Sequence, residues 1–378
     1  MRIAILTFHR AYNCGAMLQA WALQTFLESL GHTVEFPDCN HTGEEPLFVK
    51  PQFRRRTLAG KLRDLGDFFV SEILCFWNRF SIRLVKKLRF QAFMERNIKH
   101  AGSSVDDFVN RYDLIIVGSD QVWNPQVAEK EWFPHYAGVG IDNAVPMIGY
   151  AIGCGDKPLD EATLAFLKEH ARRFSALSFR EEYLVGALQL PDTPVVCDPT
   201  LLLRRAEYEK LEKPERLVRG EYLFAYCVSG DKRLLKTAQE LAKRLRVKAV
   251  IVDVYRRSWL KSGPGNDFWG LTPDRMLALI RDAKYVVAVS FHGCVFSLLY
   301  HKPFISLYLD GKYYGRHYEL LSKCRLEYRR VEVKSDMAEM EKIMLTPYCA
   351  DMEALKQGSA EWLKTALAQT GSRFTEGE

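Results

Sequence analysis

The sequence predicts an α/β protein built from two Rossmann-like domains that face each other across a cleft. Apolar strand-like runs alternate with helical periodicity through most of the 378 residues, a pattern typical of parallel α/β layers. A charged, turn-prone stretch at 213–220 separates two series of alternating strands and helices, and the chain is longer than a typical single domain. We place the first domain at 1–215 with a basic helical insert at about 44–105, the second at 216–350, and a C-terminal helix and tail at 351–378.

The first domain opens with its clearest βαβ unit. A strand at 2–8 leads through a loop into a helix from Ala16 to Leu30, which Gly31 closes, and a second strand follows at 32–36. The further strands of this domain are expected at 112–117, 146–151, 176–179 and 194–197. Each ends in polar or small residues, and ligands of open α/β sheets lie beyond the carboxyl ends of the strands. We therefore expect the site there.

The second domain repeats this alternation. Its strands are expected at 222–228, 249–254, 285–290 and 303–308. A helix is expected at about 233–245, and another at 273–282 has a proline in its first turn. Two α/β domains of this kind leave a cleft between them.

A histidine lies at a strand-to-helix corner of the second domain, in the segment Ser290-Phe-His-Gly293. The first N–H groups of a helix suit an anion, and an imidazole supplies charge or a proton near neutral pH. We expect Ser290 and Gly293 to bind substrate and His292 to be catalytic. The alternative is a histidine that only caps the turn.

The loop before the first helix contains Asn13 and Gly15, which permit close backbone approach to a ligand, although Gly15 alternatively serves only the tight turn. The loop lacks the G-x-G-x-x-G pattern, so a nicotinamide cofactor is not expected. The chain also lacks H-E-x-x-H, Walker A and G-x-S-x-G patterns and a His/Cys pair at ligand spacing. We expect neither a metal nor a cofactor.

A carboxylate follows the strand at 112–117. Asp120, between Ser119 and Gln121, is placed to accept a proton from an alcohol or to hold a sugar hydroxyl. Asp at a strand end is also a common helix or turn cap, so both interpretations stay open. We expect Asp120 to be catalytic and its two neighbours to bind substrate.

An arginine follows the strand at 176–179. The guanidinium fork of Arg180 could grip a carboxylate or phosphate, or could pair with Glu181 or Glu182. We expect Arg180 to be the third catalytic residue, beside Asp120 and His292. The segment Asp198-Pro-Thr200 is interpreted mainly as a structural turn, because proline presets the backbone of the next element.

The formal charge of +6 is concentrated in one segment. Between Lys50 and Lys99 there are 13 Lys or Arg residues and four acids, mixed with aromatics at roughly helical spacing. This segment could contact an anionic membrane, or it could be a solvated helical hairpin that packs on the main body. Nucleic-acid binding is not expected, because no recognition motif accompanies the charge.

The remaining features predict a soluble, cytoplasmic protein. The nine cysteines are scattered without a C-x-x-C pattern, as in proteins whose thiols stay reduced. The N-terminus fits neither a signal peptide nor a membrane-spanning helix. A peripheral location at the inner membrane face is the alternative that the basic segment suggests.

Five ordered motifs resemble the polysaccharide pyruvyl transferase family, and the resemblance extends from about residue 3 to 325. The motifs are Thr7-Phe-His-Arg-Ala-Tyr-Asn-Cys-Gly15 with Leu18-Gln19 and Ala22-Leu-Gln24, Val117-Gly-Ser-Asp-Gln-Val-Trp-Asn124, Ser178-Phe-Arg-Glu-Glu182, Asp198-Pro-Thr-Leu-Leu202, and Ser290-Phe-His-Gly293 with Lys302-Pro-Phe304.

This resemblance implies a GT-B type fold and transfer of a pyruvyl group from phosphoenolpyruvate to sugar hydroxyls, giving a pyruvate ketal on a bacterial capsular polysaccharide or exopolysaccharide. It implies that His292 contacts phosphate and acts as general acid, that Arg180 binds the donor, and that Asp120 orients or deprotonates the acceptor hydroxyl. The acceptor is a sugar or oligosaccharide, with a lipid-linked form as one option. The alternative function is a GT-B-like glycosyltransferase that uses a nucleotide sugar; fold alone does not separate the two.

Overall fold

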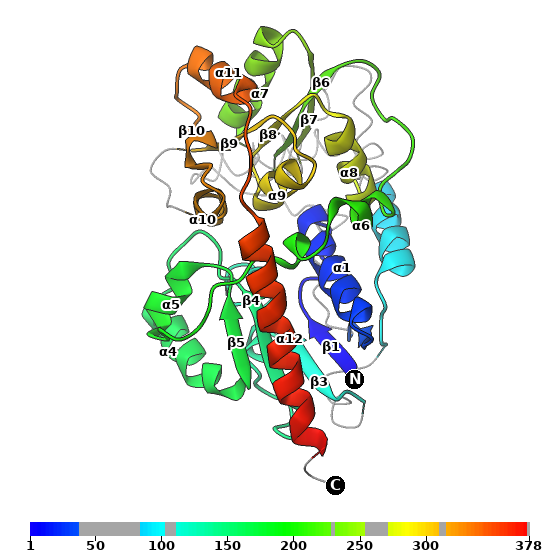
Figure 1. The fold of residues 1–378 in the computed structure, drawn as a ribbon, viewed down its shortest axis with the longest axis vertical. Coiled ribbons are helices and arrows are strands. Elements are labelled where there is room, and N and C mark those ends of the chain that lie inside the picture. The colour runs from blue at the N-terminus through cyan, green and yellow to red at the C-terminus, as the bar shows by residue number, and fades with distance from the viewer. Residues whose placement is uncertain (38–83, 103–110, 228–230, 254–270, 310–314, 376–378) are drawn as a thin grey trace, which may run out of the picture.

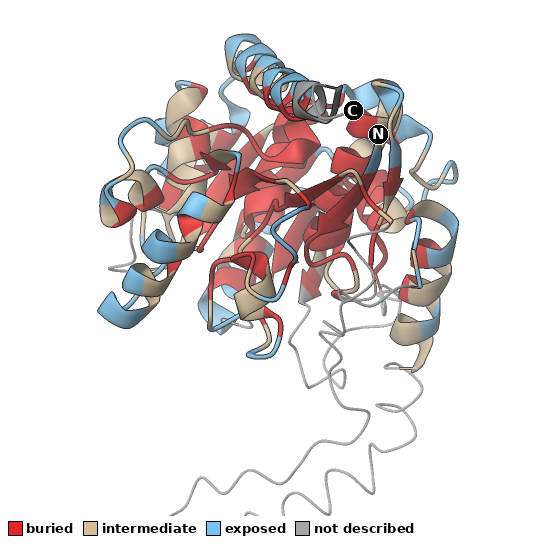
Figure 2. Ribbon diagram, turned by 90° about the horizontal axis from the view of Figure 1, so that it is seen from below, coloured by how far each residue is buried: buried red, intermediate tan, exposed pale blue. Residues whose placement is uncertain are grey.

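The computed structural model describes residues 1–37, 84–102, 111–227, 231–253, 271–309 and 315–375. Within them, the chain forms two parallel sheets of five strands each (Figure 1). The central strands are buried, and the helices that cover them turn exposed faces outward (Figure 2). The prediction of two Rossmann-like α/β domains is confirmed.

The first sheet has the strand order β2-β1-β3-β4-β5. Its strands are β1 (Arg2–Leu6), β2 (Thr33–Glu35), β3 (Leu114–Val117), β4 (Met147–Ile152) and β5 (Ala176–Phe179). Its helical elements are α1 (Cys14–Ser29), α3 (Phe133–Tyr136), α4 (Glu161–His170), η2 (Ala171–Arg173) and α5 (Glu182–Leu188). Every residue of β3 and β4 is buried, as expected for parallel strands covered on both faces.

The strand predicted at 194–197 is not formed. Only a single bridge joins Val195 to Phe179. Pro194 has no N–H to donate, and the N–H of Cys197 donates to Ser359 instead of to a strand.

The second sheet has the order β10-β9-β8-β6-β7. Its strands are β6 (Tyr222–Cys227), β7 (Lys248–Asp253), β8 (Tyr285–Ala288), β9 (Phe304–Tyr308) and β10 (Arg330–Glu332). Its helical elements are α7 (Lys232–Arg244), α8 (Pro273–Asp282), α9 (Phe291–Leu299), α10 (Arg316–Lys323), η5 (Glu327–Arg329) and α11 (Met337–Leu345). The helix predicted at 273–282 matches α8, whose first residue is the proline.

Both sheets have the same topology when their strands are numbered within each domain, namely 2-1-3-4-5. The order in which strands are added to the sheet reverses between β1 and β3 in the first sheet and between β6 and β8 in the second. Crevices that bind ligands form at such reversals, beyond the carboxyl ends of the strands. The loops after β1, β3 and β8 border these crevices.

The C-terminal helix α12 (Glu353–Thr375) returns from the second domain and lies along the first (Figure 1). Its Ser359 accepts the Cys197 N–H at 2.9 Å, and its Trp362 ring lies 6.1 Å from Tyr150 of β4. Between β5 and β6 the chain forms the short elements η3 (Pro199–Leu201) and α6 (Arg205–Glu209). The helix and this connection join the two domains.

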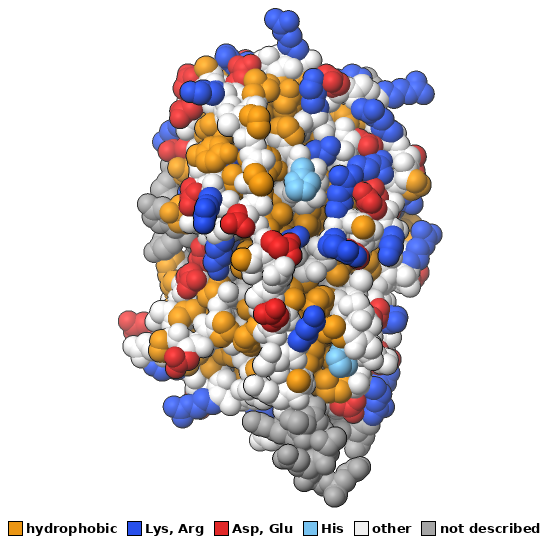
Figure 3. Space-filling model, viewed as in Figure 1, with side chains coloured by type: hydrophobic (Ala, Val, Ile, Leu, Met, Phe, Trp, Pro, Cys, Tyr) orange, Lys and Arg blue, Asp and Glu red, His pale blue; other side chains and the backbone are white. Residues whose placement is uncertain are grey.

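Most of the basic segment at 50–99, like the predicted insert at 44–105, lies outside the described residues. The described part contains a helix at 84–97 that buries Phe90, Phe93 and Met94 against the first domain. The face crossed by α12 presents basic, acidic and apolar side chains intermixed (Figure 3). Across the described ranges, no helix is both long and apolar enough to span a membrane.

Candidate active site

Arg180 follows β5 and is held by three carboxylates. Its Nη1 donates to Asp198 Oδ2 at 2.8 Å, its Nε to Glu181 Oε1 at 3.1 Å and its Nη2 to Asp120 Oδ1 at 3.3 Å. All four side chains are nine-tenths or more buried. Burial alone would lower the pKa of Arg180, but the three carboxylates outweigh it and raise this pKa. We call these four residues the Arg180 cluster; the ion pair with Glu181 that the sequence suggested as an alternative is one of its contacts.

Asp198 links the Arg180 cluster to the second domain. It accepts a hydrogen bond from Thr200 Oγ1 at 2.7 Å, and Ser119 Oγ lies 3.3 Å from its Oδ2. The same Oδ2 lies 3.7 Å from His292 Nε2. Burial raises the pKa of Asp198, but His292, Arg180 and Thr200 outweigh it and lower this pKa below its ordinary value. The segment does cap η3, as the turn interpretation predicted. That interpretation missed the second role of the carboxylate, which is to join both domains.

His292 lies in the first turn of α9 and faces the first domain. Ser290 caps this helix by accepting the Gly293 N–H at 3.1 Å, so the alternative that His292 is the cap is wrong. The ring is buried, and its Nε2 has no hydrogen-bond partner among the described residues. A Cβ atom at position 15 would overlap the imidazole Nδ1. Gly15 is therefore required for the close approach of His292 to α1.

Asp120 adopts a φ of 75°, in the left-handed region that Asp tolerates better than most residues. Its Oδ1 accepts the Gln121 N–H at 2.9 Å as well as the contact from Arg180. Asp120 therefore bonds its own turn, as a capping residue does, and also contacts Arg180 in the site. The structure brings the three predicted catalytic residues, Asp120, Arg180 and His292, into one connected group.

The side chains of Asn13, Ser119 and Gln121 bond within the protein. Asn13 caps α1 by accepting the Gly15 N–H at 2.9 Å. Ser119 donates to a backbone carbonyl of β4 at 2.9 Å, and Gln121 accepts from Asn124 Nδ2 at 3.0 Å. In this structure these three side chains support the loops that carry the site.

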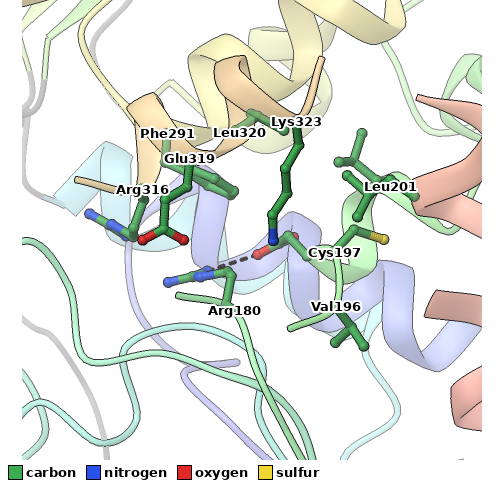
Figure 4. A pocket seen from close by; sticks show the side chains of 11 residues that line it. Arg180, Val196, Cys197, Leu201, Phe291, Arg316, Glu319, Leu320 and Lys323 are labelled. Atoms are coloured by element: carbon green, nitrogen blue, oxygen red, sulfur yellow. Dashed lines mark hydrogen bonds and ion pairs between the residues drawn. The ribbon is translucent and has the colours of Figure 1, made fainter. Parts of the chain in front are cut away.

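A pocket opens beside the Arg180 cluster, between the two domains (Figure 4). Its charged wall is formed by Arg180, Asp198, Arg316, Glu319 and Lys323, and its apolar wall includes Val196, Leu201, Phe291, Leu320 and Leu355. Sequence patterns did not predict Arg316, Glu319 and Lys323, because they lie along one side of α10 and form no motif. Within the described ranges, no group of three His, Cys, Asp or Glu residues is arranged to hold a metal.

Glu319 should make stability depend on pH. Burial raises its pKa to about 6 from an ordinary value of 4.5, although its Oε2 accepts the Glu182 N–H. The ionised form is therefore disfavoured in the folded state, a penalty absent below about pH 4 and complete above about pH 7. Because the group is partly exposed, we discount the penalty to about 1 kcal/mol.

We expect Glu319→Gln, which keeps an oxygen for the Glu182 N–H, to raise the melting temperature at pH 7.5 by about 1–3 °C. The two proteins should melt together at pH 4. An equal difference at both pH values would show that the effect does not arise from the charge.

The fold and the site define a two-domain α/β protein of the GT-B type with a buried ionic cluster and a pocket at the domain interface. The sequence model of the polysaccharide pyruvyl transferase family matches residues 13–311. The chain belongs to this family, as its motifs predicted, and is therefore a transferase of polysaccharide biosynthesis with a sugar or polysaccharide acceptor.

Solved structures share the fold. UDP-GlcNAc 2-epimerase from Methanocaldococcus jannaschii, in complex with UDP-GlcNAc and UDP, is similar with a TM-score of 0.53 and 12% identity; the match covers 98% of this chain and 100% of that one. UDP-N-acetylglucosamine 2-epimerase from Rickettsia bellii has a TM-score of 0.53 at 9% identity, covering 97% and 96%. At these identities the likeness concerns the fold alone. No protein with a curated description matches the sequence significantly.

Proposed function

We propose that this protein transfers a pyruvyl group from phosphoenolpyruvate to two hydroxyls of a sugar, forming a ketal during bacterial capsular polysaccharide or exopolysaccharide synthesis. The observation that carries the proposal is the contact of His292 with the Arg180 cluster beside an interdomain pocket, in a chain of this family. The site combines an imidazole, carboxylates and cations, which are the groups that the reaction needs.

The reaction needs one proton delivered and two removed. The methylene carbon of the donor takes a proton, which leaves an oxocarbenium-like centre on its neighbour. One sugar hydroxyl adds there and loses its proton, the bond to phosphate breaks, and the second hydroxyl adds and loses its proton. Of the two protons released, one replaces that given to the methylene carbon and the other goes to phosphate or solvent. An acid, a base and cationic contacts to the donor would support each step.

His292 is the proposed general acid. Its buried Nε2 has no hydrogen-bond partner among the described residues, which leaves its hydrogen-bonding position unfilled. The Asp198 carboxylate lies 3.7 Å away, where it can help to orient the ring. The first turn of α9 adds the positive end of a helix dipole, which favours the donor phosphate nearby.

Asp120 is the proposed group for the acceptor. Both of its contacts to Gln121 and Arg180 are made by Oδ1, which leaves Oδ2 for a sugar hydroxyl. Arg180 uses three of its five N–H donors on carboxylates. We propose that Arg180 positions Asp120 and Asp198. Its remaining N–H groups would bind the donor in the pocket that it lines.

The acceptor is proposed to be a sugar or oligosaccharide, and a lipid-linked form would bring the enzyme to the inner membrane face. The excess of Lys and Arg at 50–99 motivates this part of the proposal. Flotation with anionic liposomes at low and high salt tests it: salt-sensitive binding is expected, and its absence would remove the membrane contact.

The donor is tested by thermal-shift titration with phosphoenolpyruvate beside a panel of nucleotide sugars, on the wild type and His292→Ala. A ligand that binds the folded state raises the melting temperature by mass action. We expect a shift with phosphoenolpyruvate that weakens in the variant. A shift with a nucleotide sugar alone would instead favour a glycosyltransferase.

A further inference from the structure

Helix α10 of the second domain places two cations in the pocket wall, Arg316 and Lys323 (Figure 4). Arg316 also lies over the Phe291 ring, with its guanidinium carbon 5.8 Å from the ring centre. Arg180 of the first domain lies 5.0 Å from the same ring. Positive groups from both domains therefore converge on the region around Phe291.

The present partners of the two α10 cations are exposed carboxylates of the first domain. Arg316 pairs with Asp156 at 3.3 Å, and the Asp156 side chain is 47% exposed. Lys323 lies 3.8 Å from Glu182, whose side chain is 63% exposed. Such pairs contribute little to stability because water screens them. The partners of Arg180, in contrast, are buried and would be costly to remove.

Asp156 shows what kind of group this position accepts. Its Oδ1 also accepts the backbone N–H of Arg316 at 3.1 Å, so one carboxylate takes donors from both the side chain and the first turn of α10. A carboxylate or phosphate of a ligand would satisfy the same donors.

We propose that Arg316 and Lys323 bind the anionic groups of the donor, and that the donor takes over the places that Asp156 and Glu182 now occupy. The identity of the donor as phosphoenolpyruvate rests on the proposed function; the anion site itself does not. The cations belong to the second domain and their present partners to the first. Donor binding would therefore break ion pairs between the domains and replace them with contacts to the ligand.

The exchange gives two variants opposite effects on affinity. Arg316→Gln removes the binding group and is expected to weaken phosphoenolpyruvate binding at least about tenfold. Asp156→Asn removes the competing charge and is expected to tighten it about threefold, because a larger fraction of the protein is then competent to bind. A purely structural ion pair would not produce a gain of affinity when one partner is removed.

Calorimetric titration with phosphoenolpyruvate, and separately with inorganic phosphate and a nucleotide sugar, tests the proposal on the full chain. The matched control is Arg244→Gln, which removes a surface pair to Glu341 between α7 and α11. Melting temperatures without ligand establish that each variant is folded. The control should bind like the wild type.

The outcomes separate this inference from the proposed function. If the wild type binds phosphoenolpyruvate and Arg316→Gln binds it equally well, the anion role of Arg316 is overturned while the function stands. If the wild type binds only phosphate or a nucleotide sugar, and Arg316→Gln weakens that binding, the anion site stands and the donor is wrong. Binding of none of the three ligands would overturn both.

Discussion

Arg180→Gln is expected to lower the free energy of unfolding by about 3–5 kcal/mol and to remove activity. The substitution leaves Asp120, Glu181 and Asp198 buried beside one another without their shared cation. Removing one partner of a buried ionic cluster lowers the free energy of unfolding by this amount, because the remaining charges are buried without a counter-ion or water to stabilise them. Urea unfolding followed by circular dichroism measures the change.

Two further variants make this test specific. Arg244→Gln, which breaks an exposed ion pair, should cost no more than about 1 kcal/mol. Arg180→Lys keeps the charge but replaces a planar fork by a single ammonium, which cannot contact three carboxylates in the same geometry. We expect this variant to be intermediate in stability and to have low activity. Full stability and full activity of Arg180→Lys would show that the cluster does not depend on the guanidinium fork.

His292→Gln is expected to lower the turnover rate by about 10²–10⁴-fold, the range typical of a lost general acid, with little change in the unfolding free energy. Glutamine retains a polar side chain but cannot deliver a proton near neutral pH. The unfolding free energy should fall far less than in Arg180→Gln, because the imidazole makes one 3.7 Å contact to Asp198, which keeps its closer contacts to Arg180 and Thr200. Initial rates and melting temperatures of the same preparations measure the two effects.

The matched control for this variant is His170→Gln at the end of α4, whose ring hydrogen-bonds a nearby backbone carbonyl, that of Phe166. It should retain the wild-type rate. If His292→Gln turns over like this control, His292 is not the acid. If it unfolds at a much lower temperature, its role is structural.

The fold could be predicted because strands and helices leave local patterns. The apolar runs at β3, β4, β6 and β8 are buried over their whole length, and the proline at the start of α8 marks that helix correctly. The segment at 194–197 has the same apolar character but makes only a bridge. The backbone N–H of Cys197 bonds to Ser359 of α12, a residue remote in sequence, so no local pattern shows that this segment is not a strand.

The site could be predicted only where it follows a strand. Asp120, Arg180 and His292 are predicted correctly as neighbours because each follows the carboxyl end of a parallel strand, where α/β domains form their ligand crevices. Asp198 was interpreted as a turn residue because Asp-Pro-Thr has a sufficient local explanation, while its contacts to Arg180 and His292 come from elsewhere in the chain. Nothing local shows that an aspartate caps a turn and also joins two domains.

Two features of the site arise only from the docking of the domains. Gly15 has an ordinary explanation in a turn, and its need to be glycine appears once His292 lies against it. Arg316 and Lys323 are separated on an amphipathic helix and look like solvated charges in the sequence. Their place in the pocket follows from how α10 meets the first domain.

The most direct test of the proposed transferase activity is turnover with phosphoenolpyruvate and a panel of sugar acceptors, followed by phosphate release and by the mass of the product. We predict that phosphate appears only when an acceptor with two free neighbouring hydroxyls is present, that the product gains one pyruvyl ketal, and that His292→Gln abolishes both signals. Transfer of a sugar from a nucleotide sugar, with phosphoenolpyruvate unconsumed under every condition, would contradict the proposed function.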